Sequence, residues 1–210
     1  MDREQEVLIE QVKDEAKAIF KGDYSGHDIS HTMRVYSLAL EIAKSEKADL
    51  LRVALTALLH DADDYKITGK DDGSLENTVD ILGKIGLEES VKQKICEDIK
   101  NLSFRGNGKT VPASMEGKIV QDADRLDAMG AVGIARTFAY AGNKNLPLYD
   151  YAGDGDLDNP GRDSAVGHFY RKLLKLKDFM NTETAKKMAE ERHRFMLDFL
   201  DRLNTEIGAE

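Results

Sequence analysis

His60 and Asp61 stand side by side at the end of an apolar run, residues 50–59. Such a run predicts a buried helix, where an uncompensated carboxylate is very costly. A divalent cation is the obvious compensation, since neutral imidazole and carboxylate together suit Mn, Fe, Ni, Zn and similar ions. Taken alone, however, this dipeptide more often caps a helix end. The metal hypothesis therefore depends on finding further ligands elsewhere in the chain.

Two other segments place metal-binding residue types among apolar neighbours. His31 opens a predicted helix, one turn after His27, and residues 121–127 carry three carboxylates between apolar residues. Each feature has an ordinary explanation, because a lone histidine is usually structural and Asp124 could pair with a basic residue. Three such segments in one chain nevertheless favour a shared metal site.

The elements that must position these residues are helices. Apolar residues recur at helical spacing along the whole chain, and no alternating strand of useful length is present, which predicts an all-α fold. The predicted helices span about residues 3–21, 29–46, 49–62, 74–85, 88–102, 114–128, 131–141, 164–180 and 183–206. The longest irregular stretch, 142–163, is of a length typical of functional lids and of mobile connections, and its role stays open.

Composition excludes several classes of function. The net charge of -9 and the pI near 5.1 argue against a nucleic-acid polymer or an anionic membrane as a partner, because both require a basic surface. Cys96 is the only cysteine, so a disulfide framework and a thiolate-rich zinc site are excluded and a reducing cytoplasm is expected. The start of the sequence lacks a signal-peptide core, and no apolar window has membrane-spanning length.

The order of the candidate ligands resembles the HD-domain metal-dependent phosphohydrolase superfamily. A histidine opens one helix, a His-Asp pair follows Ala-Leu-Leu at 57–59, and an aspartate lies in Ala-Asp-Arg-Leu at 123–126. The resemblance covers about residues 27–140 and implies a compact HD-type helical bundle. Residues 58–66 and 119–131 are most similar to the small single-domain bacterial and archaeal branch, whose members include nucleotide-directed hydrolases. We therefore expect one domain over 1–210, with a helical extension at about 163–206.

The resemblance also implies a ligand set. It assigns the metal ligands to His31, His60, Asp61 and Asp124. Asp124 is preferred to Asp122 because the family's last ligand precedes a basic residue and a leucine, although a shift of two positions stays open. Binuclear members of the superfamily use additional histidines between the pair and the last aspartate. This chain has no histidine from 62 to 167, which favours a single ion.

Catalytic and substrate-binding residues are predicted around these ligands. Asp64 follows Asp61 by three residues, where the resemblance implies a catalytic acid or base acting on water or the leaving oxygen. Lys66 is predicted to neutralise phosphate charge in catalysis. The predicted substrate-binding residues are His27, Arg34 and Arg125. Without the resemblance, each of these residues would be interpreted as an ordinary surface or packing residue.

The predicted function is a cytoplasmic hydrolase of a phosphoester or phosphoanhydride bond in a small phosphorylated metabolite, with nucleotides as the favoured class. Its cofactor would be one divalent ion, and Mn, Fe, Ni, Co, Zn and Mg all suit the ligands. Three alternatives stay open: an alarmone hydrolase, a cyclic-nucleotide hydrolase and a non-catalytic nucleotide sensor. The sequence is also compatible with a homodimer formed through the terminal helices.

Overall fold

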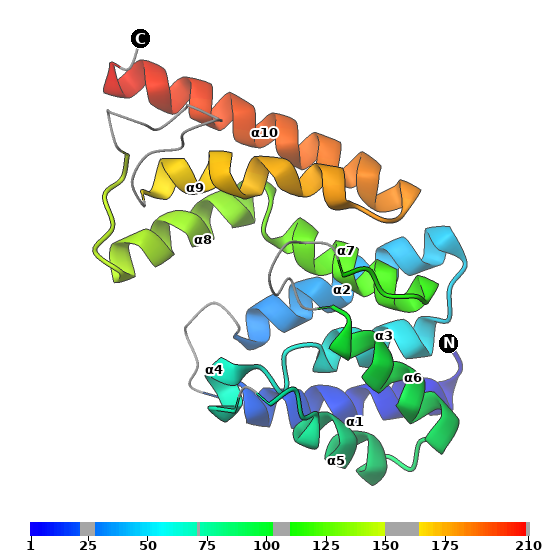
Figure 1. The fold of residues 1–210 in the computed structure, drawn as a ribbon. Coiled ribbons are helices and arrows are strands. Elements are labelled where there is room, and N and C mark those ends of the chain that lie inside the picture. Colours follow the sequence, from blue (N-terminus) through cyan, green and yellow to red (C-terminus); the bar gives the residue numbers. More distant parts are fainter. Residues whose placement is uncertain (22–27, 71, 103–109, 150–163, 209–210) are drawn as a thin grey trace. The chain divides into compact units, whose positions relative to one another are not determined.

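The structure is a computed structural model that describes residues 1–21, 28–70, 72–102, 110–149 and 164–208. Within these ranges all regular structure is helical and no strand occurs, which confirms the predicted all-α class. The chain divides into two compact units, Met1–Ala123 and Asp124–Glu210, and the boundary falls inside one continuous helix. Figure 1 shows the helices, coloured along the chain from blue at the N-terminus to red at the C-terminus.

The first unit is organised around a short, largely apolar helix, α3 (Leu50–Leu59). Every residue from Val53 to Leu59 is buried, so this helix must be covered on all sides. Its neighbours are α1 (Arg3–Ile19), α2 (Ile29–Glu46) and α6 (Glu89–Lys100). The unit also contains α4 (Tyr65–Thr68), α5 (Glu76–Lys84) and the start of α7 (Met115–Asp127).

Aspartate caps fix where α2 and α3 begin. The Asp28 carboxylate accepts a 2.8 Å hydrogen bond from the His31 N–H, and the Asp49 carboxylate accepts one of 3.1 Å from the Arg52 N–H. Lys47 ends α2 in the left-handed conformation, with φ 57°, and turns the chain into α3. His31 therefore lies in the first turn of α2 and His60 directly follows the last turn of α3.

A buried ionic network joins α3, α6 and the start of α7. Arg52 Nη2 donates to Asp98 Oδ2 at 2.6 Å, and Arg52 Nη1 donates to Glu116 Oε2 at 3.1 Å. The Ser114 hydroxyl donates to the other Asp98 oxygen at 2.5 Å. Burial raises the pKa of the Asp98 carboxyl above its ordinary value, although Ser114 and Arg52 act in the opposite direction. Helix α3, which His60 directly follows, is thereby linked to α6 and to the start of α7 through charged side chains.

The second unit begins with the end of α7. It continues with α8 (Gly130–Asn143), α9 (Ala165–Arg171), the 3₁₀ helix η1 (Leu173–Phe179) and α10 (Glu183–Ile207). Phe138, Phe169 and Phe199, from α8, α9 and α10, form an aromatic cluster with ring centroids 5.7–6.1 Å apart. These contacts fasten the three α-helices to one another.

Two helix predictions need correction, and one short helix was missed. The predicted helix 164–180 is α9 followed by η1; Leu173 and Leu176 are both buried, and residues three apart share a face in a 3₁₀ helix. The predicted helix 49–62 ends at Leu59, so the His60–Asp61 pair lies in a turn. The short helix α4 was not predicted. No helix in the described ranges is long and apolar enough to cross a membrane.

Candidate metal centre

Three polar atoms from α2 and the turn after α3 converge in the first unit. His60 Nε2 lies 3.3 Å from His31 Nε2 and 3.3 Å from Asp61 Oδ2, and His31 Nε2 lies 3.5 Å from the same carboxylate oxygen. The side chains of His31, His60 and Asp61 are 3%, 4% and 15% exposed. Two imidazoles and a carboxylate are therefore held together in a largely water-excluded place.

The backbone of α3 fixes the orientation of His60. Its Nδ1 lies 2.8 Å from the Ala57 carbonyl oxygen, which can only accept a hydrogen bond. In the neutral imidazole, Nδ1 therefore carries the proton and Nε2 presents a lone pair to His31. A second hydrogen bond of this kind is the usual way in which a protein orients a metal-binding histidine.

The separations fit a shared cation. Ligand atoms bound to one ion at about 2.1 Å lie about 3.0 Å apart when adjacent in an octahedron and about 3.4 Å apart in a tetrahedron. The observed separations of 3.3, 3.3 and 3.5 Å agree with those values. The donor set of neutral nitrogens and a carboxylate oxygen also suits a divalent ion of intermediate hardness.

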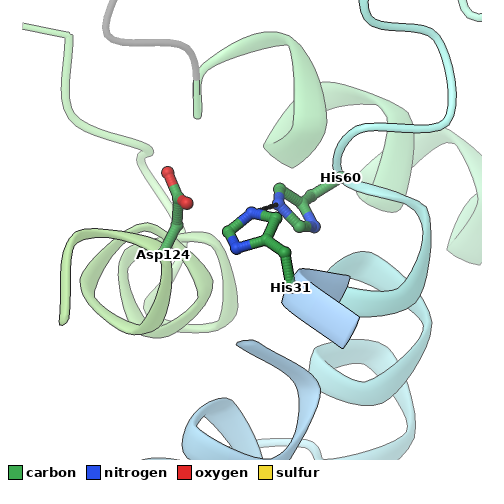
Figure 2. A group of neighbouring side chains, drawn as sticks. All are labelled: His31, His60 and Asp124. Carbon is green, nitrogen blue, oxygen red and sulfur yellow. Dashed lines mark hydrogen bonds between the residues drawn. The ribbon is translucent and has the colours of Figure 1, made fainter. Parts of the chain in front are cut away.

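Asp124 belongs with His31 and His60 to a group of residue types that could hold a metal ion. It follows Ala123 directly within α7, and one ligand atom from each of His31, His60 and Asp124 lies within 4.8 Å of the others. Figure 2 shows the two imidazoles facing each other with the Asp124 side chain next to them. Asp122 is fully buried, and residues two apart point to nearly opposite sides of a helix. The assignment of the last ligand to Asp124 rather than Asp122 stays a prediction.

The predicted catalytic residues lie in and after the same turn. The Asp64 N–H donates to the Asp61 carbonyl at 3.0 Å, and the Asp64 carbonyl accepts hydrogen bonds from the Ile67 and Thr68 N–H groups of α4. The Asp64 side chain is half-buried. Lys66 lies in α4, but its side chain is outside the described part of the structure.

The predicted substrate-binding residues belong to separate segments of the chain, and each is described by its own surroundings. Arg34 lies one turn after His31 on α2 and is half-buried. Arg125 is only 5% exposed, and its guanidinium donates to the backbone carbonyl of Phe179. His27 lies outside the described residues, as does most of the 142–163 stretch. The prediction for all three residues therefore stays a prediction.

Sequence reasoning missed the contacts that hold the end of α7 within the second unit. The Arg192 guanidinium of α10 donates to the Leu126 carbonyl at 2.5 Å, and Arg136 Nη1 of α8 donates to Asp127 Oδ2 at 2.6 Å. Both acceptors lie within three residues of Asp124. No local sequence signal marks these pairs, because the partners are 66 and 9 residues apart.

Comparison of the sequence and fold with known proteins identifies the family of this chain. The family model of the HD domain matches residues 28–129. The Bacillus subtilis protein YpgQ is 45% identical over 200 residues, which cover 94% of this chain and 93% of YpgQ. A crystal structure of YpgQ in complex with ADP superposes with a TM-score of 0.82 and 38% identity, over 98% of each chain. An HD-superfamily hydrolase from Bacillus thuringiensis superposes with a TM-score of 0.81 and 39% identity, over 98% of this chain and 100% of the other.

Proposed function

This chain belongs to the HD-domain family, and we propose that it is a metal-dependent phosphohydrolase acting on a nucleotide or a similar small phosphorylated metabolite. The observation that carries the proposal is the convergence of His31, His60 and Asp61, whose polar atoms lie 3.3–3.5 Å apart. A purely structural pair of histidines would not need a carboxylate within reach of both rings. A site that binds a divalent cation needs such a carboxylate, because it balances part of the charge of the ion.

We propose that His31, His60, Asp61 and Asp124 hold one divalent ion. When bound, such an ion lowers the pKa of a water molecule and polarises a phosphoryl oxygen. The two histidines supply neutral nitrogen ligands, and the two aspartates balance the charge of the ion. The Ala57 carbonyl keeps His60 in the tautomer that this role requires.

The remaining proposed roles concern protons and phosphate charge. Asp64 follows the ligand turn, and its half-buried carboxylate would take a proton from the attacking water or give one to the leaving oxygen. Arg34, one helical turn from His31, and Lys66 on α4 would attract and orient the phosphate. Arg125 donates to the Phe179 carbonyl, so we propose a smaller part in substrate binding for it than for Arg34.

The nucleotide class is supported by one relative. YpgQ has been crystallised in complex with ADP, and it matches this chain over 98% of its length. We therefore propose a nucleoside phosphate as the first substrate class to test. The acidic character of the chain, with a net charge of -9, fits a small-molecule substrate better than a nucleic-acid polymer.

The test combines metal binding with turnover. Isothermal titration with Mn²⁺ would measure affinity and stoichiometry, and release of phosphate or pyrophosphate from nucleoside mono-, di- and triphosphates would measure hydrolysis. We expect one ion per chain and hydrolysis in the wild type. Both should be lost in His31→Ala and Asp61→Ala proteins that retain the wild-type circular dichroism spectrum.

His193→Gln is the matched control, because it removes a histidine that lies on α10 outside the candidate centre. It should keep wild-type Mn²⁺ affinity and turnover. Full activity in the His31→Ala protein would refute the proposed site. Nucleotide binding without turnover under Mn²⁺, Fe²⁺, Ni²⁺, Co²⁺, Zn²⁺ and Mg²⁺ would refute catalysis and favour a nucleotide sensor.

A further inference from the structure

We propose that Asp63 is a positioning residue that fixes the turn carrying His60, Asp61 and Asp64 by capping helix α5. This inference rests on the proposed function, because it assigns Asp63 a role in metal binding and turnover. Asp63 lies between the candidate ligand Asp61 and the candidate acid or base Asp64, but its own carboxylate is engaged elsewhere. Its contacts make it the link between the turn and the body of the first unit.

The Asp63 carboxylate binds the first turn of α5 with both oxygens. Oδ1 accepts a hydrogen bond from the Asn77 N–H at 2.8 Å, and Oδ2 accepts one from the Thr78 N–H at 3.0 Å. The Thr78 hydroxyl donates to Oδ2 as well, at 2.7 Å. Three donors thus hold one carboxylate, which leaves its side chain little rotational freedom.

Helix α5 needs such a partner. The first N–H groups of any helix lack an acceptor within the helix, and they carry partial positive charge. The local N-cap residue of α5, Leu75, has no side-chain acceptor and makes no capping hydrogen bond. Asp63 supplies the missing cap from 14 and 15 residues earlier in the chain.

A second contact joins the same helix to the backbone of the turn. The Asn77 side-chain amide donates to the Ala62 carbonyl at 2.8 Å, so α5 holds both the backbone of residue 62 and the side chain of residue 63. Within the turn, the Ala62 N–H donates to the Leu59 carbonyl and the Asp64 N–H to the Asp61 carbonyl, each at 3.0 Å. Any rotation of the turn would break several of these bonds together.

Helix α5 is itself held in place by the apolar core of the first unit. Ile81 and Leu82 of α5 are buried in the same apolar core as Leu58, Leu59 and Ala62. The turn is therefore anchored on one side by α3 and on the other by a helix that packs against the same core. Partners of this kind commonly change metal affinity about 10- to 100-fold when they are removed, because the ligands lose their preset orientation.

The experiment measures Mn²⁺ affinity by isothermal titration in two pairs of variants. Asp63→Ala removes all three bonds, whereas Asp63→Asn keeps one acceptor oxygen. Thr78→Val removes only the hydroxyl bond, whereas Thr78→Ser preserves it. We expect Asp63→Ala to weaken Mn²⁺ binding about 10- to 100-fold. Asp63→Asn and Thr78→Val should weaken it less, and Thr78→Ser should match the wild type.

Two further readouts separate positioning from a purely structural cap. Amide hydrogen exchange in metal-free protein should become faster at residues 60–64 in the Asp63 and Thr78→Val proteins. Substrate turnover should show a lower kcat with a smaller change in KM, because the Asp63 carboxylate is engaged by donors of α5. Thr182→Ala is the matched control: Thr182 caps α10 through the Ala185 N–H at 3.2 Å, so its loss should lower stability without changing Mn²⁺ affinity.

The outcomes distinguish the inference from the proposed function. If wild-type protein binds no Mn²⁺, the proposed metal site fails, and exchange at residues 60–64 still decides whether Asp63 fixes the turn. If the wild type binds Mn²⁺ and Asp63→Asn, Thr78→Val and Thr182→Ala all match it, the positioning role is refuted. The Thr78 pair decides the question if Asp63→Ala does not fold.

Discussion

Replacement of Arg52 by methionine should destabilise this protein strongly at neutral pH. Arg52 bridges Asp98 and Glu116 at 2.6 and 3.1 Å, and Asp98 is only 3% exposed. Methionine keeps the apolar stem but removes the guanidinium charge, and the Asp98 carboxylate keeps the hydrogen bond from the Ser114 hydroxyl. Breaking a buried pair by removing one partner costs about 3–5 kcal/mol. Because the Arg52 and Glu116 side chains are each 15% exposed, we expect the lower end, about 3 kcal/mol.

The loss of unfolding free energy in the Arg52→Met protein should become smaller as the pH falls. Burial already raises the pKa of Asp98 above the ordinary value of 3.8, and loss of the Arg52 charge would raise it further. A carboxyl with a raised pKa in the folded state binds its proton more tightly there than in the unfolded chain. Its ionisation therefore removes stability as the pH rises from 3.8 through the raised value. Each additional unit of pKa corresponds to about 1.4 kcal/mol at neutral pH.

Urea unfolding followed by circular dichroism, at about pH 7 and about pH 4.5, measures both effects. Lys84→Met is the matched control, since Lys84 also bridges two carboxylates, Asp80 and Glu15, but does so in solvent with its side chain 51% exposed. Its replacement should change stability little at either pH. An Arg52→Met protein as stable as the Lys84→Met protein, or a deficit that does not decrease on acidification, would refute the reasoning.

Three other predictions concern packing, protonation and metal binding. Gly117→Ala should lower the unfolding free energy by about 2 kcal/mol, because a Cβ there would approach neighbouring side-chain atoms to 2.6 Å. Gly83→Ala, with no atom within 4 Å, should raise it by about 0.5–1 kcal/mol, and calorimetry measures both. Burial and the Lys177 charge lower the pKa of His193 below 6.5, so stability should fall as the pH decreases from 6.5 through the lowered value. His193→Gln should flatten that decrease in urea unfolding. Mn²⁺ at about one hundred times its Kd should stabilise the protein by about 2.7 kcal/mol in a thermal-shift assay, and His31→Ala should abolish the gain.

Each of these three predictions has a result that would contradict it. Changes of the same sign in the two glycine variants would contradict the packing argument. An unaltered acid slope in His193→Gln would show that another group titrates in that range. Persistent stabilisation of the His31→Ala protein by Mn²⁺ would place the ion elsewhere on the chain.

The sequence by itself determined the helical class and the segments that carry the candidate ligands. Apolar spacing is local information, and it predicted α2 from 29 to 46 with the observed bounds. The composition of the segment before His60 predicted a wholly buried helix, and residues 53–59 are indeed all buried. The ordered pattern of His31, the His60–Asp61 pair and Asp124 was sufficient to predict the family.

Only the tertiary structure decided how these residues meet. That the polar atoms of His31, His60 and Asp61 lie 3.3–3.5 Å apart depends on the packing of α2 against α3, which no local pattern encodes. The same holds for Asp63, whose partners lie 14 and 15 residues away, and for Arg52, whose partners lie 46 and 64 residues away. Short-range spacing sets helices, because backbone hydrogen bonds and side-chain faces repeat within a few residues. Bonds between distant side chains form only after the apolar core has fixed the distances between those helices.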